Sequence, residues 1–332
     1  MSLGFIYGKA GTDRQKLVLQ QLEEWQSSAS VSEIFYIVPD HIKFESEVTV
    51  LDYLRHQKGE MEKMFASANV QTFSFSRLMW YFLKEQPALT KTRLTPTGLS
   101  MIVTHILHEL DEKELYVFTR ERNSPGFSKK LAEQIVELKL GGFLPEDLEQ
   151  FAKNLQTKDK GEQVDLGQRL HDFSLVYTKF EKYIAGQYLD TAESLDELIN
   201  YLQTVDLSQS CFVIDGFTSF NAKEKEVISV LMQKAAEVRV SLILNHKYVD
   251  SKPETSDLFY QTGKIYYELT QQAKASHVAR MVDKRAADSR VSADLTSLED
   301  FWIDSQTFSP PKKYYLEDAQ SLSLTETSDR VR

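Results

Sequence analysis

The chain has 332 residues, 42% hydrophobic and 27% charged, a size that favours two domains or one domain with a large insertion. Its formal net charge of −10 argues against a surface that coats nucleic acid throughout, although a local basic groove needs only a few cations. The single cysteine, Cys211, excludes an internal disulfide and a cysteine-based zinc or iron–sulfur site, and no apolar run reaches ~18 residues, so we expect a cytoplasmic protein.

Strand and helix patterns alternate three times in the N-terminal part of the chain. The expected strands cover residues 3–7, 33–40 and 69–73, and a helix is expected after each of them. The alternation predicts right-handed crossovers and therefore a parallel sheet. The second of these helices carries four apolar residues along one side, namely Phe44, Val48, Leu51 and Leu54.

Residues 90–204 carry apolar side chains at helical spacing and almost no strand pattern. Leu131, Ile135 and Leu138, for example, share one face of an expected helix. Residues 153–168 are polar and charged, so we expect a mobile loop there. This part of the chain is therefore interpreted as a helical insertion.

The α/β pattern resumes with expected strands at residues 210–214 and 239–245 and a helix between them. After residue 284 the sequence is polar and loop-like, with Pro310 and Pro311 in an expected linker and the start of a further strand and helix at the end. The expected fold is thus an α/β parallel sheet with a large inserted all-helical subdomain. The expected boundaries are 1–88 and 206–285 for the two parts of the α/β domain, 89–205 for the insertion, and 286–332 for a linker and the start of a truncated second domain.

A glycine-containing loop follows the first expected strand, where a phosphate-binding loop would read G-x-x-x-x-G-K-[ST]. Gly8 opens the window and Gly11 lies within it. Asp13, Arg14 and Gln15 stand at the positions of the second glycine, the lysine and the hydroxyl residue. A carboxylate ~4 Å from a phosphate costs roughly 1–4 kcal/mol at effective dielectrics of about 80 to 20. We therefore expect a degenerate nucleotide-binding loop that does not hydrolyse ATP.

The second acidic position of such a site is also incomplete. The strand at residues 210–214 ends in Asp215, which would ligate magnesium, but the carboxylate that orients water is replaced by Gly216. A plain interpretation is open at both places, because Thr12 or Asp13 can simply cap a helix and Asp215 can cap a turn. Both the loop after the first strand and the acidic position after residue 214 are deficient, and together they favour a degenerate nucleotide-binding site.

Aromatic and basic side chains cluster after three of the expected strands, at the edge where open parallel sheets bind ligands. Aromatic rings stack on unpaired bases at roughly 1–3 kcal/mol each, while neighbouring cations contact the phosphates. Core packing is the alternative for each ring, and the sequence contains no histidine–glutamate metal spacing. The candidate contacts to single-stranded DNA are His41, Lys43, Phe75, Arg77, Trp80 and Phe217.

Six segments carry a family resemblance over nearly the whole chain. They are FIYGKAG at 5–11, YIVPD at 36–40, TFSFSRLMW at 72–80, LHDFSLVYTKFEKYIAGQYLD at 170–190, VIDGFTSF at 213–220 and LFYQTGKIYYEL at 258–269. In this order they resemble the N-terminal region of the B subunit of the bacterial ATP-dependent helicase–nuclease, the AddB/RexB family. TFSFSRL and IDGF are fairly specific as a set and weak singly.

The resemblance implies a P-loop, RecA-like core of the superfamily-one helicase type with an inserted helical subdomain. It further implies a module that does not drive translocation but binds single-stranded DNA and scans it for Chi, in a heterodimer whose A subunit is the motor. The six candidate DNA contacts match the family's Chi-reading positions, although His41 and Lys43 differ from the Gln and Thr of some members, which leaves the sequence that is read open. Some members also keep an intact phosphate loop. The family's nuclease, with its Mg²⁺ and 4Fe–4S cluster, lies beyond residue 332, so we expect no cofactor here.

Two other functions stay open from the sequence. The chain is either an active P-loop ATPase or small-molecule kinase with a non-standard loop, which ATP turnover would reveal, or a scaffold that only docks the motor subunit. The acidic composition is compatible with the scaffold.

Overall fold

A computed structural model describes residues 1–57, 69–85, 91–156, 161–305, 320–323 and 325. The chain forms two compact units. Unit 1 comprises Met1–Phe75, Asp206–Ser219 and Ser229–Arg332, and unit 2 comprises Ser76–Val205 and Phe220–Ile228. No helix among the described residues is long and apolar enough to cross a membrane.

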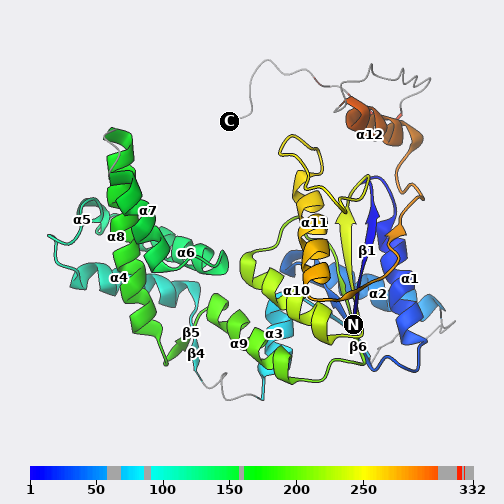
Figure 1. Ribbon diagram of the computed structural model, residues 1–332, viewed down its shortest axis with the longest axis horizontal. Helices are drawn as coiled ribbons and strands as arrows, with labels where there is room; N and C mark the ends of the chain where they lie inside the picture. The colour runs from blue at the N-terminus through cyan, green and yellow to red at the C-terminus, as the bar shows by residue number, and fades with distance from the viewer. Residues whose placement is uncertain (58–68, 86–90, 157–160, 306–319, 324, 326–332) are drawn as a thin grey trace. The chain divides into compact units, whose positions relative to one another are not determined.

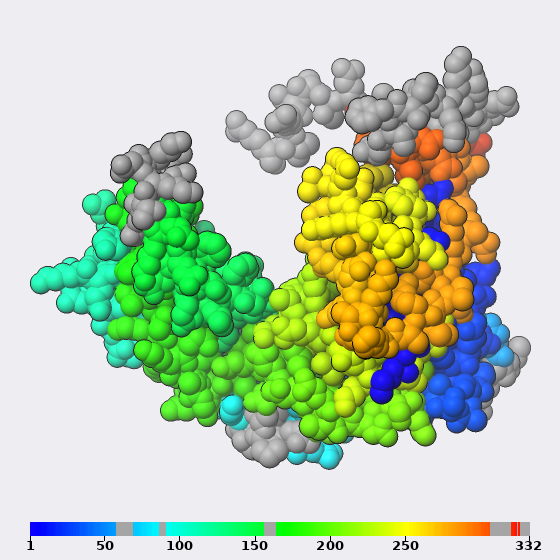
Figure 2. All heavy atoms as spheres, in the orientation of Figure 1, coloured from blue at the N-terminus to red at the C-terminus, as the bar shows by residue number. Residues whose placement is uncertain are grey.

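Unit 1 is built on a seven-stranded sheet with the order β3-β2-β6-β7-β1-β8, in which β9 also pairs with β1. Neighbouring strands are parallel, and Ile37 at the end of β2 pairs with Ile214 at the end of β6. The strands are β1 (Ser2–Gly8), β2 (Glu33–Ile37), β3 (Val70–Phe73), β6 (Ser210–Ile214), β7 (Glu237–Ile243), β8 (Ala279–Arg280) and β9 (Lys284–Arg285). In Figure 2 the blue N-terminal segment lies against the orange residues that supply β8 and β9.

Both faces of this sheet are covered, which explains why its strands read as continuous apolar runs. Ile6 packs with Val18 and Leu22 of α1, whereas its neighbour Phe5 points to the other face and meets Tyr266 of α11 at a ring distance of 4.3 Å. Figure 1 shows α11 over the sheet. The helices of unit 1 are α1 (Arg14–Gln26), the 3-10 helix η1 (Asp40–Ile42), α2 (Lys43–Gln57), α11 (Tyr260–Ala275) and α12 (Ala293–Ser305), and α10 (Ala222–Lys234) spans both units.

Unit 2 is helical, apart from the short parallel pair β4 (Thr92–Arg93) and β5 (Tyr188–Leu189). Its core contains Ile106, Ile135 and Phe180, and the buried carboxylate of Asp172 accepts hydrogen bonds from three backbone N–H groups at the start of α5. The helices are α3 (Phe75–Leu83), α4 (Pro96–Glu109), α5 (Phe118–Glu121), α6 (Phe127–Leu140), α7 (Pro145–Gln156), α8 (Gly161–Ile184) and α9 (Thr191–Thr204). The predicted α/β class, parallel sheet and inserted helical region are confirmed.

The prediction of a loop over residues 153–168 was wrong for the described part of that range. α7 continues to Gln156 and α8 begins at Gly161, so both ends of the range are helical. Leu148 and Ala152 on α7 are buried, so α7 has a packed apolar face beside the polar one. A polar surface face was therefore mistaken for a loop.

The apolar side expected for α2 is buried only in part. Phe44 is 77% exposed and Val48 is 50% exposed, while Ser46, Val50 and Leu54 are buried. The buried residues follow each other at a spacing of four, and Val50 and Leu54 pack in the same cluster as the strands of unit 1.

The region after residue 284 contains α12 rather than loop alone. Pro310, Pro311 and most of the last residues lie outside the described part of the chain.

Candidate functional site

The loop between β1 and α1 is a capped turn. The carboxylate of Asp13 accepts a hydrogen bond from the backbone N–H of Lys16 at 3.0 Å, which caps the first turn of α1. The hydroxyl of Thr12 donates to the carbonyl oxygen of Lys9 at 2.8 Å. The geometry thus matches the plain helix-capping interpretation of Asp13.

The two glycines of this loop face crowded surroundings. A Cβ at Gly8 would lie 2.3 Å from Oγ1 of Thr12 and 2.9 Å from Cβ of Ala286. A Cβ at Gly11 would lie 2.8 Å from a carboxylate oxygen of Glu299. The loop is therefore filled by the protein's own side chains.

Arg14 is half-buried at the start of α1 and donates a hydrogen bond to the carbonyl oxygen of Lys9 at 3.3 Å. Burial lowers the pKa of the Arg14 guanidinium, and the carboxylates of Asp215 and Glu299 oppose that shift. Gln15, which stands at the position of a magnesium-ligating hydroxyl, is exposed. Arg14 thus has internal carboxylates for neighbours, where a working loop would offer a phosphate.

Asp215 at the end of β6 is engaged with a neighbouring strand. Its carboxylate accepts a hydrogen bond from the hydroxyl of Tyr36 at 2.9 Å. Burial raises the pKa of Tyr36 well above its usual value, and the negative charge of Asp215 adds to that effect. The phenol therefore stays protonated and remains a donor to Asp215.

Gly216 cannot be replaced by the missing acidic residue without a rearrangement. Its φ is +82°, and a Cβ there would lie 2.7 Å from Cδ1 of Ile42 and 3.2 Å from Cδ of Pro39. The segment after β2 approaches the backbone so closely that a side chain at position 216 requires Ile42 to shift. The positive φ and this close approach both favour glycine over an acidic residue.

The magnesium–nucleotide pair of a working phosphate loop does not fit these residues. Asp215 already accepts from Tyr36, position 15 offers an amide, and Glu299 lies against Gly11. Among the described residues, no group of three or more His, Cys, Asp or Glu side chains is arranged to hold a metal ion.

The expected gathering of strand ends is present within unit 1. β2 and β6 are neighbours, so η1 with the exposed His41 and the loop with the half-buried Phe217 leave the same edge of the sheet. Lys43 is half-buried and lies 3.7 Å from the carboxylate of Glu47. Phe75 is only 6% exposed, and its ring meets that of Phe217 edge-on at 5.4 Å. Burial favours a packing role for Phe75 over stacking on a base.

Arg77 and Trp80 belong to unit 2 and lie one helical turn apart on α3. The guanidinium carbon of Arg77 is 4.3 Å from the centroid of the Trp80 ring, which is a cation–π contact. Arg77 is exposed and Trp80 is 42% exposed. The pair therefore presents a positive charge and an aromatic face together on the surface of unit 2.

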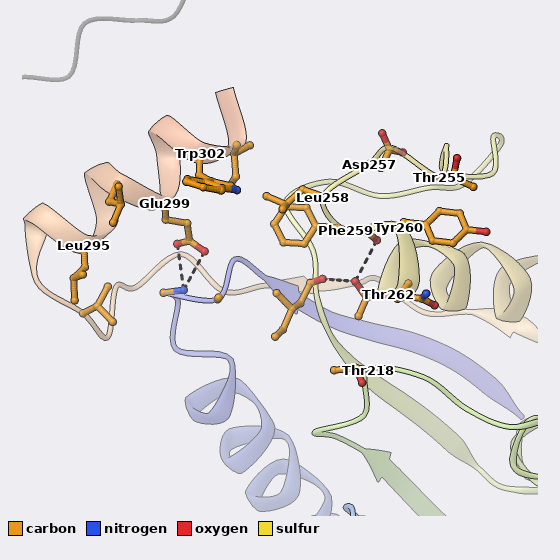
Figure 3. Close-up of a pocket in the computed structure, with 17 residues that line it drawn as sticks. Thr218, Thr255, Asp257, Leu258, Phe259, Tyr260, Thr262, Leu295, Glu299 and Trp302 are labelled. Atoms are coloured by element: carbon orange, nitrogen blue, oxygen red, sulfur yellow. Dashed lines mark hydrogen bonds between the residues drawn. The ribbon is translucent and has the colours of Figure 1, made fainter. Parts of the chain in front are cut away.

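The sequence analysis missed Glu299 and Asp300 on α12. Both carboxylate oxygens of Glu299 (Figure 3) accept from the backbone N–H of Gly11 at 3.2 Å. Lys9 forms an ion pair with Asp300. A cavity of about 970 Å³ lies beside this contact, and it is lined by residues that include Leu258, Phe259, Leu295, Leu298, Val291 and Trp302. Gly11 and Glu299 are 288 positions apart in the sequence, and no local pattern indicates such a pair.

Comparison with known proteins identifies the family. A family model described as "ADDB, N-terminal" matches residues 5–299. Relatives named as the B subunit of an ATP-dependent helicase/deoxyribonuclease include those of Levilactobacillus brevis (37% identical over 93% of this chain and 26% of the relative), Latilactobacillus sakei subsp. sakei (35%, 92% and 25%) and Enterococcus faecalis (36%, 94% and 26%). The chain spans about a quarter of the length of these relatives. With nearly its whole length matched by the family model, the chain belongs to the ADDB N-terminal family.

Proposed function

We propose that this chain is the N-terminal region of the B subunit of an ATP-dependent helicase–nuclease for double-strand break repair and recombination, and that it holds single-stranded DNA without hydrolysing ATP. The relatives carry the name of such a subunit. The observation that carries the DNA-binding part is the exposed cation–π pair of Arg77 and Trp80.

The pair has the two properties that binding to unpaired strands needs. An exposed aromatic face stacks on a base whatever its identity, at roughly 1–3 kcal/mol, and the adjacent guanidinium neutralises a phosphate. Trp80 holds the Arg77 guanidinium over its ring, so the cation is ordered before the strand arrives. In unit 1, His41, Lys43 and Phe217 supply further cationic and aromatic groups at one sheet edge.

The family resemblance supports a partner subunit and a role in scanning the strand. We propose a cytoplasmic heterodimer in which an A subunit supplies the motor and this chain recognises Chi on the passing strand. The degenerate loop supports this division of labour, because Asp13 caps a helix, Gln15 is exposed and Gly216 stands where the second carboxylate would be. ATP turnover by the purified chain that is abolished by Arg14→Ala would contradict the proposal.

Fluorescence anisotropy with a labelled single-stranded oligonucleotide tests the DNA-binding part. Trp80→Ala is expected to weaken the affinity about 5- to 150-fold, which corresponds to about 1–3 kcal/mol. Arg77→Ala is expected to weaken it for all sequences and to reduce the slope of log Kd against log salt by about one.

Two substitutions in unit 2 serve as matched controls. Tyr183 is 42% exposed, as Trp80 is, and Lys84 is an exposed cation that follows α3 and lies over the ring of Tyr81. Tyr183→Ala and Lys84→Ala should leave the affinity within about twofold of wild type. Equal losses of DNA affinity in the controls and in the Arg77 and Trp80 variants would contradict the assignment of the DNA contact to this pair.

A docking role is the second candidate, and the surface of α2 favours it. Phe44 and Val48 lie one turn apart and are 77% and 50% exposed. If they dock the motor subunit, Phe44→Ser with Val48→Ser weakens co-purification with that subunit and leaves DNA binding unchanged. Unchanged co-purification removes this surface from consideration.

A further inference from the structure

The backbone N–H of Gly11 meets a carboxylate supplied by the chain itself. Both carboxylate oxygens of Glu299 lie 3.2 Å from that nitrogen. Figure 3 marks these hydrogen bonds with dashed lines from Glu299. An N–H group in the loop that leads into a helix is where a working phosphate loop would meet a phosphate oxygen. Glu299 thus places a negative charge where such a loop binds its ligand.

The neighbouring residues strengthen this arrangement. Lys9 forms an ion pair with Asp300, the residue after Glu299. The backbone N–H of Arg290 donates to the carbonyl oxygen of Gly11 at 2.9 Å, and the side chain of Arg290 donates to the carbonyl oxygen of Ala10 at 3.2 Å. Arg14 also has Glu299 among its neighbouring charges. Lys9 therefore has an internal carboxylate for a partner, while the side chains of Arg14 and Arg290 donate to backbone carbonyl oxygens of the loop.

The attachment of α12 is mainly polar. Its only buried residue is Asp294, while Leu298, Phe301 and Trp302 are 40%, 40% and 56% exposed. A helix that buries so little apolar surface gains little from the hydrophobic effect on docking. The contacts of Glu299 and Asp300 are therefore the polar contacts of α12 itself with the loop, while Arg290 ties the preceding segment to Ala10 and Gly11. Both carboxylate contacts are surface interactions that are readily exchanged for water.

We propose that α12 is a built-in latch on the β1–α1 loop, in which the carboxylates of Glu299 and Asp300 take the place of a bound anion and keep polyphosphates out. Undocking of α12 uncovers Gly11 and frees Lys9. This device concerns the loop in unit 1 and is independent of DNA contact at Arg77 and Trp80, so a chain that fails to bind DNA leaves it standing.

Amide hydrogen exchange tests the docking directly. In the variant Glu299→Ala with Asp300→Ala, the peptides that contain Gly11 and α12 are expected to exchange at least about tenfold faster than in wild type. Peptides from β6 and β7 should exchange at the wild-type rate, which shows that the sheet remains folded. The matched control is Glu24→Ala, which removes the ion pair with Lys284 on the same unit and should leave the Gly11 peptide unchanged. Unchanged exchange at Gly11 and α12 in the double variant overturns the latch.

Calorimetric titration with tripolyphosphate tests the anion-mimic part. The double variant is expected to bind tripolyphosphate at least about tenfold more tightly than wild type, because it loses two negative charges and uncovers one N–H donor. The Glu24→Ala control should bind as wild type does. Equal affinities in wild type and the double variant, including no binding by either, overturn the claim that these carboxylates exclude the anion.

Discussion

At the scale of single residues, Gly216 stands at the position where an active site of this type would carry its water-orienting carboxylate. Its backbone has a positive φ, and Pro39 and Ile42 approach the space where a side chain would start. An acidic residue at this position would have to adopt the positive φ and shift the side chain of Ile42. The sequence shows only that the acidic residue is missing, whereas the structure supplies the steric reason.

Gly216→Ala is therefore expected to lower the free energy of unfolding of unit 1 by about 1–3 kcal/mol, from backbone strain and from the clash with Ile42. Gly126 is a matched control, because it has a φ of +78° but nothing within 4 Å of the place that a Cβ would take, and its replacement by Ala should cost about 1 kcal/mol. Native-state hydrogen exchange reports each unit separately. Equal losses at both glycines would show that the close approach contributes nothing.

Cys211 gives a prediction about pH. Burial raises the pKa of its thiol to about 12, whereas a thiol in an unfolded chain has a pKa of about 8.5. The folded chain keeps a proton that the unfolded chain loses, so the stability contributed by Cys211 is complete below pH ~8.5 and is lost as pH rises toward 12. Urea titrations measure the difference in the free energy of unfolding between wild type and Cys211→Ala. We expect this difference to be constant at pH ~6–8, below the pKa of the unfolded thiol, and to fall at higher pH. A constant difference up to pH ~10 would contradict this.

At the scale of the elements, the apolar runs predicted five strands of the sheet, because strands buried on both faces leave a continuous signal. The two-residue strands β8 and β9 were missed. Of the four apolar residues expected along one side of α2, Leu54 is buried and Leu51 is half-buried, whereas Phe44 and Val48 are exposed. The prediction of a loop at residues 153–168 was wrong for the described part of that range, because the polar faces of α7 and α8 obscure their helical pattern. Local patterns therefore predicted the buried strands more reliably than helices with large polar faces.

The orientation of α2 can be tested by two substitutions on that helix. Phe44→Ser should change the free energy of unfolding by no more than about 0.5 kcal/mol, because the ring is 77% exposed. Val50→Ala should lower it by about 1–3 kcal/mol, because Val50 is 2% exposed in the core of unit 1. Urea unfolding measures both, and a larger loss from Phe44→Ser than from Val50→Ala would reverse the assignment of the buried face.

At the scale of the whole molecule, the sequence predicted the α/β class and the family, but only part of the candidate site. It placed His41, Lys43 and Phe217 after strands that do end at one edge, and it placed Arg77 and Trp80 on one helix. It did not predict the contact between α12 and the β1–α1 loop. Gly11 and Glu299 are 288 positions apart, so their contact follows from tertiary packing alone.

Photo-crosslinking tests the central claim, that this chain holds single-stranded DNA at Arg77 and Trp80, most directly. A single-stranded oligonucleotide that carries 5-iododeoxyuridine would be irradiated with the purified chain, and the crosslinked peptides would be identified by mass spectrometry. We predict a crosslink to Trp80 within α3 (Phe75–Leu83), because the exposed indole stacks on the base. Crosslinks that occur only in other parts of the chain would contradict the account.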